Sequence, residues 1–293
     1  MQKMKSNSYK FAVIGGDKRQ LFLIASLLSD GYSVLAGGFD SLSGSGDISF
    51  VGVEQAIAHS DIIILPIPAV CADGSLNAPF NSEKIIFSED VQTMLRSKLV
   101  FAGMSDRLVR SYPQLSGAKV YDYSLKEEFA VLNSVPTAEG ALALAMQKSE
   151  RTIWGSKIMI IGYGRIGKSL SRLASSMGAA VTVCARGSGD RAAAQTQGCE
   201  VLDTSSLHEL RDFDFIFNTV PAMLLDKKLL SCTDQSSIVL DLASLPGGVD
   251  FEAAKRLGID AFRALALPGK YAPKTAAEII KSVVLDILRE NKA

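Results

Sequence analysis

The turn Gly162-Tyr163-Gly164-Arg165-Ile166-Gly167 has the spacing of a dinucleotide-binding fingerprint. In that fingerprint the first glycine allows a tight turn, the second lets the backbone approach a pyrophosphate, and the third lets a helix pack closely against a strand. The helix N-terminus then offers unpaired N–H groups and a partial positive charge to the phosphates. The turn therefore predicts that its six residues bind a nicotinamide dinucleotide. The plainer interpretation is a purely structural turn.

The glycine turn and its helix are followed by a second predicted strand, residues 180–184. The residues just after this strand indicate which dinucleotide binds. NAD sites usually carry Asp or Glu at this strand tip to bind the ribose 2′-hydroxyl. Here the tip is followed by Arg186, Ser188 and Arg191, and the first carboxylate is Asp190. Because a guanidinium can bind a 2′-phosphate with paired hydrogen bonds, these residues favour NADP. NAD stays open as the alternative, with Arg186 then a solvated loop charge.

Later predicted strands, 213–217 and 237–242, run into turns of small residues or proline. Such turns let backbone and hydroxyl groups reach a nicotinamide ring, although each alone is also explained as turn punctuation. The predicted cofactor contacts in these turns are Asn218, Thr219, Val220, Pro221, Asp241, Ala243 and Ser244.

Strands and helices must alternate to position these turns. The run 158–161 is typical of a buried strand and the apolar spacing over 166–177 of a helix, ended by Gly178. The first half repeats this order, with residues 9–17 a strand running into glycine and further strands at 32–36, 61–65, 84–87, 98–102 and 119–123. Alternation of this kind predicts an α/β protein with two Rossmann-like, doubly wound parallel-sheet domains and a cleft between them. Helix 275–290 is expected to cross back to the first domain.

The expected domains are residues 1–148 with 276–293, for the substrate and catalysis, and residues 149–275, for NAD(P). A helix break is expected near 133–136, because the residue before a proline disfavours helix, with a new helix starting at Pro136. Trp154, the only tryptophan, is expected to pack between the domains. Loop 67–81 lies beyond a strand end, where binding residues tend to gather.

The first domain opens its own glycine turn with Gly15-Gly16-Asp17, followed by Lys18 and Arg19. Asp17 would oppose a phosphate, so this turn predicts a Rossmann-like half without a nucleotide. Arg19 is equally interpreted as a ligand for a substrate carboxylate and as part of a water-facing charge pair at the helix start.

Composition excludes several classes of function. The chain has 293 residues, 47% hydrophobic and 21% charged, with a formal net charge of zero, which indicates neither nucleic acid nor an anionic membrane as partner. No apolar signal segment or membrane-length apolar run is evident, so a cytoplasmic protein is expected. The four cysteines lack CxxC spacing and predict no metal site.

Four segments together resemble one family. Residues 15–20, 133–140, 241–250 and 267–275 are similar to the A-type subunit of dipicolinate synthase from spore-forming bacteria, within the wider group of D-2-hydroxyacid and alanine dehydrogenases. The resemblance implies oxidation of dihydrodipicolinate, a lysine-pathway intermediate, to dipicolinate with NAD(P)⁺. It also implies that the flavoprotein-like B-type subunit of the same enzyme is a partner and that the protein works in the mother-cell cytoplasm during sporulation. A homo-oligomer is also expected. The histidine that D-2-hydroxyacid dehydrogenases use as acid/base has no counterpart in the matching late stretch.

Within that hypothesis, Arg19, Lys18 and Lys270 are candidates to hold two substrate carboxylates. Asn133, Ser134 and Thr137 are candidate hydrogen-bond donors, and Glu139 is a candidate proton acceptor unless it only complements a helix dipole. Two other functions stay open: a related NAD(P)-dependent amino-, keto- or hydroxy-acid dehydrogenase, and a non-catalytic NADP-binding subunit of a flavoprotein complex.

Overall fold

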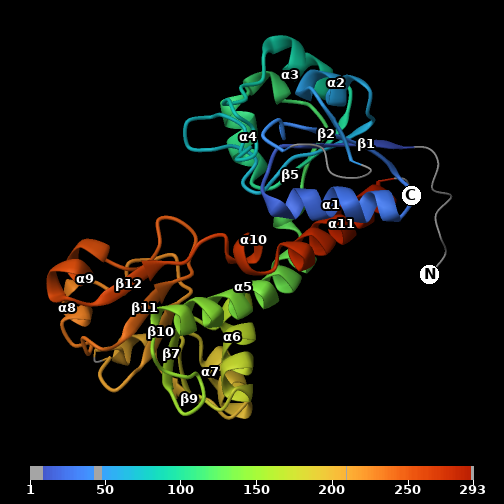
Figure 1. Ribbon diagram of the computed structural model, residues 1–293. Helices are drawn as coiled ribbons and strands as arrows, with labels where there is room; N and C mark the ends of the chain where they lie inside the picture. Colours follow the sequence, from blue (N-terminus) through green and yellow to red (C-terminus); the bar gives the residue numbers. More distant parts are fainter. Residues whose placement is uncertain (1–8, 43–47, 209, 292–293) are drawn as a thin grey trace. The chain divides into compact units, whose positions relative to one another are not determined.

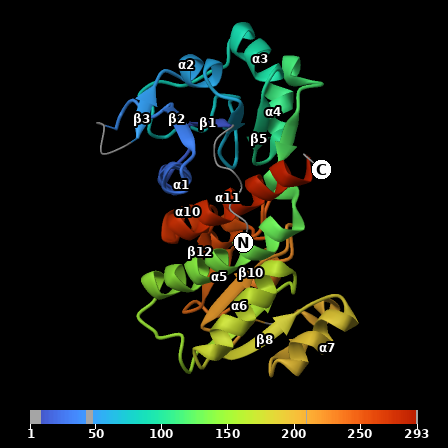
Figure 2. The same ribbon diagram turned by 90° about the vertical axis from the view of Figure 1, so that its right-hand side faces the viewer.

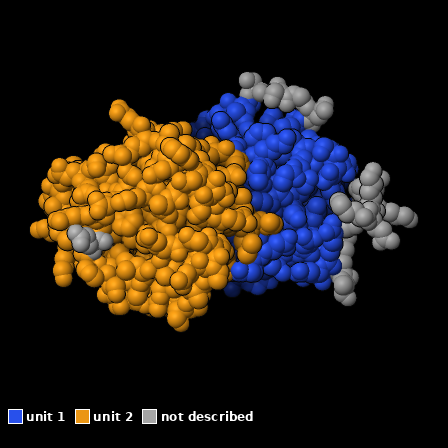
Figure 3. Space-filling model, turned by 90° about the horizontal axis from the view of Figure 1, so that it is seen from below, with its two compact units in different colours: residues 1–130, 273–293 blue, residues 131–272 orange. Residues whose placement is uncertain are grey.

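The chain divides into two compact units. The computed structural model describes residues 9–42, 48–208 and 210–291. Unit 1 comprises residues 1–130 and 273–293, and unit 2 comprises residues 131–272 (Figure 3). The expected division at 148/149 was therefore too late, because it falls at the end of helix α5 (Glu127–Lys148). Most of α5 belongs to unit 2, where Ala138, Leu142 and Ala145 are core residues.

Unit 1 is built on a sheet of six parallel strands in the order β3-β2-β1-β4-β5-β6, which is the order of the dinucleotide-binding fold (Figure 1). The strands are β1 (Lys10–Ile14), β2 (Ser33–Gly37), β3 (Ser49–Val51), β4 (Ile62–Ile64), β5 (Leu99–Ala102) and β6 (Val120–Asp122). The helices are α1 (Lys18–Ser29), α2 (Val53–Ala58), α3 (Glu89–Arg96), α4 (Ser105–Ser111) and α11 (Pro273–Glu290), with 3₁₀ turns η1 (Pro113–Leu115) and η2 (Tyr123–Leu125).

Helices cover both faces of this sheet. Alternate strand residues point to opposite faces, so Phe11 and Val13 meet α1 and α11, whereas Ala12 and Ile14 meet α2 and α3. The C-terminal helix α11 lies beside α1 (Figure 1) and buries the apolar stripe that includes Ile280 and Val284. The predicted return of the last helix to the first domain is thereby confirmed.

Unit 2 repeats the fold, with six parallel strands in the order β12-β11-β10-β7-β8-β9. The strands are β7 (Lys157–Ile161), β8 (Ala180–Cys184), β9 (Glu200–Leu202), β10 (Phe215–Asn218), β11 (Ile238–Asp241) and β12 (Asp260–Arg263). The helices after α5 are α6 (Arg165–Ser176), α7 (Ser188–Thr196), α8 (Lys227–Leu230), α9 (Phe251–Leu257) and α10 (Leu267–Tyr271), with the 3₁₀ turn η3 (Thr204–Ser206).

One face of the unit 2 sheet is covered by α5, α6 and α7 and the other by α8 and α9 (Figures 1 and 2). Residues 158–161 of β7 and 215–217 of β10 are buried, continuous apolar runs, as is usual for parallel strands with both faces covered. Two Rossmann-like parallel sheets confirm the predicted α/β class.

Three local predictions were wrong. Residues 84–87 form no strand; Phe87 is buried, and its N–H reaches the Tyr112 hydroxyl at 3.4 Å instead of a neighbouring strand. The sheet includes instead the strand β3, which lies at one of its edges. The sequence also predicts a helix near 205–210, but the structure has only the 3₁₀ turn η3 there, whose start is capped by Asp203; residue 209 lies outside the described part. Trp154 is 76% exposed rather than packed between domains.

Helix α5 runs without a break through Pro136, contrary to the predicted new start there. The proline removes only one backbone donor, and the helix is anchored on both sides of it. Phe129 is buried in the core of unit 1, and Ala138, Ala141 and Leu142 are buried in that of unit 2. Packing at both ends thus outweighs the local preference for a break.

Within the described ranges, α5 is also the helix with the length and apolar composition to cross a membrane, and 50% of its apolar window is buried inside the protein. Its contacts with β7 and β10 in the unit 2 core identify it as a core helix.

Candidate functional site

The glycine turn of unit 2 connects β7 to α6 at the carboxyl edge of the sheet. Gly162 has φ +98°, and a Cβ there would lie 2.3 Å from Oγ1 of Thr219. A Cβ on Gly167 would lie 2.2 Å from the carbonyl oxygen of Gly162, so this glycine lets α6 approach the turn closely. In contrast, a Cβ on Gly164 would meet nothing within 4 Å. Gly164 is the N-cap of α6 and offers no side-chain cap, so backbone N–H groups remain available to an anion.

A cavity of about 430 Å³ adjoins this turn. Its lining includes Gly162 and Tyr163 from the turn, Arg186 and Asp190 beyond β8, and Val220 beyond β10. A larger hollow of about 680 Å³ lies at the opposite edge, beside Lys157 at the start of β7, away from the glycine turn. Because open α/β sheets bind ligands at the carboxyl ends of their strands, the smaller cavity is the candidate site.

Residues of the turn contribute in different ways. The Tyr163 side chain is 3% exposed and packs in the core, and burial raises the pKa of its hydroxyl, so only its backbone remains to face a cofactor. Ile166 also packs against the core, whereas Arg165 is exposed at the start of α6.

The predicted cations beyond β8 have separate positions. Arg186 and Ser188 are exposed, and Ser188 begins α7. Arg191, in contrast, donates from Nη1 to the carbonyl oxygens of Ala185 and Arg186, each at 2.8 Å, and pairs with Asp203. Arg191 therefore holds the backbone of the strand tip through Nη1, and its contact with a 2′-phosphate stays a prediction.

Asn218 and Asp241, at the ends of β10 and β11, are both fully buried. Asn218 Nδ2 donates to Asp241 Oδ1 at 2.8 Å and to the Val220 carbonyl at 2.9 Å. The Asp241 carboxylate also accepts from the N–H groups of Ala243 at 3.3 Å and Gly248 at 3.0 Å. These two side chains thus bind neighbouring turns together. The sequence had suggested instead that they present polar atoms to a cofactor.

The other predicted contacts of these turns surround that pair. Thr219 Oγ1 donates to the Ile161 carbonyl at 2.9 Å, next to the glycine turn. Pro221 and Ser244 are exposed, Val220 is half-buried, and Ala243 is buried.

The glycine turn of unit 1 is occupied by the protein's own groups. Gly16 N–H donates to the Asn77 carbonyl at 2.7 Å, and Asp17 N–H donates to Gln20 Oε1 at 3.1 Å. Asp17 in turn accepts from the N–H of Arg19, completing a capping box at the start of α1. The backbone donors that would hold a pyrophosphate are therefore engaged, and an acidic side chain stands in their place.

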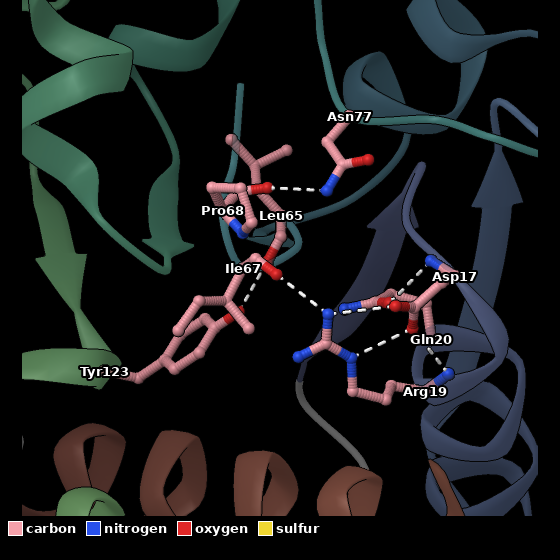
Figure 4. Close-up of polar contacts among 8 residues, drawn as sticks. All are labelled: Asp17, Arg19, Gln20, Leu65, Ile67, Pro68, Asn77 and Tyr123. Carbon is pink, nitrogen blue, oxygen red and sulfur yellow. Dashed lines mark hydrogen bonds and ion pairs between the residues drawn. The ribbon is translucent and has the colours of Figure 1, made fainter. Parts of the chain in front are cut away.

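Arg19 is 7% exposed and lies between Asp17 and loop 67–81 (Figure 4). Its Nε and Nη2 each bind a different Asp17 oxygen at 2.9 Å, and Nη2 also donates to the Ile67 carbonyl at 2.8 Å. Burial disfavours the Asp17 carboxylate, but the bonds and charge of Arg19 outweigh this and hold its pKa below the usual value. Arg19 is thus not a water-facing charge; only Lys18 is exposed.

The candidate donors of α5 are largely engaged within the helix. Thr137 Oγ1 donates to the Asn133 carbonyl at 2.7 Å, and Ser134 Oγ donates to the Val131 carbonyl at 2.7 Å while contacting Ser169 Oγ on α6. Neither hydroxyl is presented as a free donor. Glu139 is exposed in mid-helix and not in a first turn, and Lys270 is exposed on α10, which packs against α5 at Gly140.

Sequence reasoning missed several groups around Arg19. Gln20 is fully buried, with Oε1 bonded and Nε2 lacking a partner in the described part of the chain. Tyr123, also buried, donates to the Leu65 carbonyl at 3.1 Å, and Asn77 Nδ2 donates to the Pro68 carbonyl at 3.0 Å (Figure 4). The Asp17-x-x-Gln20 spacing was the available signal, because it is a capping-box pattern.

Two parallel sheets, one with a glycine turn that fits a dinucleotide, define a two-domain dehydrogenase of the Rossmann type. Residues 137–240 match the NAD-binding domain of D-isomer-specific 2-hydroxyacid dehydrogenases, and residues 10–124 match the N-terminal domain of the A-type subunit of dipicolinate synthase. The chain is 35% identical to the A-type subunit of dipicolinate synthase from Bacillus subtilis, over 97% of each chain. It belongs to that family.

Solved structures agree with this assignment. The corresponding dipicolinate synthase subunit of Bacillus halodurans superposes with a TM-score of 0.86 at 33% identity, covering 95% of this chain and 97% of that one. The Bacillus subtilis protein gives a TM-score of 0.83 at 35% identity, covering 96% of each chain. A Sinorhizobium meliloti transhydrogenase, at 16% identity and a TM-score of 0.67 over 94% of this chain and 93% of that one, shares the fold.

Proposed function

We propose that this chain oxidises dihydrodipicolinate to dipicolinate with a nicotinamide cofactor. The observation that carries the proposal is the 35% identity to the A-type subunit of dipicolinate synthase over 97% of the chain. The glycine turn of unit 2 supports it independently, because Gly164 leaves space beside the uncapped N-terminus of α6.

The oxidation removes one hydride and one proton from the dihydropyridine ring and leaves an aromatic ring. A bound nicotinamide would supply the hydride acceptor. Because aromatisation drives the reaction, the protein's main contribution is to hold the substrate ring carbon about 3–3.5 Å from that acceptor. Glu139, exposed on α5, is the candidate that takes the proton.

Cationic side chains are proposed to hold the two substrate carboxylates. Arg19 Nη1 is the part of that guanidinium without a hydrogen-bond partner in the described residues, so it supports one contact. The side chains of Lys18 and Lys270 are both exposed. Asn133 remains a candidate through its side-chain amide, whereas Ser134 and Thr137 would have to give up their helix carbonyls to donate.

NADP is the proposed cofactor because Arg186 is exposed beside the cavity and Ser188 opens α7 next to it. Asp190 also lines the cavity and would suit the ribose hydroxyls of NAD, so the two cofactors must be compared directly. A second, flavoprotein-like subunit is proposed as partner, in the mother-cell cytoplasm of a sporulating bacterium, together with self-association.

The test follows NADPH and NADH absorbance after the purified chain is mixed with freshly prepared dihydrodipicolinate and either oxidised cofactor. Equimolar formation of reduced cofactor and dipicolinate is expected. Turnover of an amino, keto or hydroxy acid in its place would assign a related dehydrogenase. Cofactor binding without turnover, even in the presence of the flavoprotein-like partner, would contradict catalysis and favour a non-catalytic cofactor-binding role.

A further inference from the structure

We propose that Asp241 is a positioning residue for the nicotinamide half of the cofactor and acts only through the turns that it holds. The proposal rests on the proposed function, because it presumes that unit 2 binds a nicotinamide dinucleotide. It concerns a residue that is 0% exposed and therefore touches no ligand itself.

The location of Asp241 follows from the sheet. In the sheet of unit 2, β10 and β11 lie on one side of β7. The strands β8 and β9 lie on its other side. In this fold the pyrophosphate lies at the glycine turn after the first strand and the adenosine ribose at the tip of the second, here β8. The nicotinamide half must therefore extend over the turns beyond β10 and β11, where Asn218 and Asp241 lie.

The Asp241 carboxylate is the shared acceptor of these two turns. Oδ1 accepts from Asn218 Nδ2 at 2.8 Å, and this bond connects Asp241 to the turn after β10. Oδ2 accepts from the Gly248 N–H at 3.0 Å, and this bond closes the turn after β11. The Gly248 carbonyl then accepts from the Leu225 N–H at 2.9 Å, so the two turns are also joined by backbone.

Close packing leaves little freedom for this arrangement. A Cβ on Gly247 would lie 2.4 Å from Asp241 Oδ2, and a Cβ on Gly248 would lie 2.4 Å from Asn218 Nδ2. The side chain of Leu245, within the second turn, is 56% exposed, and that of Met223, beyond the first, is 59% exposed. Both residues thus expose apolar surface in or next to the two turns.

One link between the glycine turn and the end of β10 does not involve Asp241. Thr219, which packs against Gly162, is held by Ile161 through both its N–H and its Oγ1, each 2.9 Å from the Ile161 carbonyl. Loss of the carboxylate should therefore disturb the nicotinamide side and leave the pyrophosphate and adenosine side intact.

The substitution Asp241→Asn tests this directly. The amide NH₂ of the new asparagine must face either the Gly248 N–H or Asn218 Nδ2. In either orientation two buried hydrogen-bond donors face each other. Asp250→Asn is the matched control, because Asp250 caps α9 through the Ala253 N–H and asparagine is an equally good cap. Asn218→Ala is the second variant, in case Asp241→Asn does not fold; it removes the link to β10 and keeps the bond to Gly248.

Calorimetry should measure the affinity of each protein for two ligands. The first is the oxidised dinucleotide that the wild type prefers, and the second is the matching ADP-ribose, which is 2′-phosphorylated if that dinucleotide is NADP. Asp241→Asn is expected to bind the dinucleotide at least roughly tenfold more weakly and ADP-ribose as the wild type does. Asn218→Ala should show the same pattern, and Asp250→Asn should bind both like the wild type. Equal losses for both ligands, or no loss, would overturn the positioning role. A wild type that binds neither ligand would instead overturn the proposed function.

Discussion

Asp17 and Arg19 form a two-pronged ion pair across the first turn of α1, with Oδ1 and Oδ2 each 2.9 Å from a guanidinium nitrogen. The same guanidinium bonds the Ile67 carbonyl, so it ties the helix start to the loop after β4. One charge is therefore shared between a structural contact and a proposed substrate contact. This double use decides what substitutions at either residue should do.

Arg19→Ala should lower stability and weaken substrate binding together. The change leaves Asp17 partly buried without its cation and the Ile67 carbonyl without its donor, at a cost of about 1–3 kcal/mol. Urea unfolding measures this loss, and steady-state kinetics should show a strongly raised KM for the substrate with unchanged NADP binding. Lys18→Ala, at the exposed neighbour, is the stability control and should stay within about 0.5 kcal/mol of wild type. A normal KM would assign Arg19 a structural role alone.

Asp17 should make stability depend on pH in the acidic range. Burial raises the pKa of Asp17, but the hydrogen bonds and charge of Arg19 lower it by more. The pKa therefore lies below the usual 3.8. A carboxyl group with a depressed folded-state pKa stabilises the protein above its unfolded-state pKa, and this contribution is lost as the pH falls through the folded-state value. Unfolding free energy measured from neutral to acidic pH should therefore fall less steeply in Asp17→Asn, which retains the helix cap. Parallel curves for variant and wild type would contradict the ion pair's role.

The sequence was sufficient for the architecture because the parallel strands are apolar runs separated by glycine turns. Gly162 and Gly167 even have the conformation and close approach that their spacing predicts. It was insufficient where distant packing decides. Pro136 has the sequence features of a helix start, yet α5 continues through it because its two ends are buried in different cores.

Polar residues at strand ends were located correctly, but their partners were not predictable. Asn218 and Asp241 resemble ligand contacts in sequence, yet they bond each other because β10 and β11 are neighbours in the sheet. Arg191 likewise looks equivalent to Arg186 until Asp203, beyond β9, is found beside it. Sequence spacing gives the edge of the sheet on which a side chain lies, whereas hydrogen-bond partners depend on the three-dimensional register.

Arg186 should distinguish NADP from NAD. Its side chain is exposed beside the cavity, and a charge-assisted bond to a 2′-phosphate is worth enough that Arg186→Ala should weaken NADP binding roughly tenfold or more. NAD affinity should not change, because NAD lacks that phosphate. Arg96→Ala, an exposed arginine on α3 of unit 1, is the matched control, and calorimetry with both cofactors is the measurement. An equal loss of both affinities would show that Arg186 does not read the 2′-phosphate.

The glycines of the unit 2 turn should separate stability from binding. Gly167→Ala places a Cβ 2.2 Å from the Gly162 carbonyl, and such overpacking should lower the unfolding free energy by about 1–3 kcal/mol. Gly164→Ala meets no protein atom within 4 Å and has φ −75°, so stability should stay within about 0.5 kcal/mol of wild type. The added methyl group would instead occupy the space proposed for the pyrophosphate, and calorimetry should show dinucleotide affinity reduced roughly tenfold or more. Gly52→Ala, at an open position in unit 1, should leave that affinity unchanged. Wild-type affinity in Gly164→Ala would mean that the cofactor does not approach this backbone.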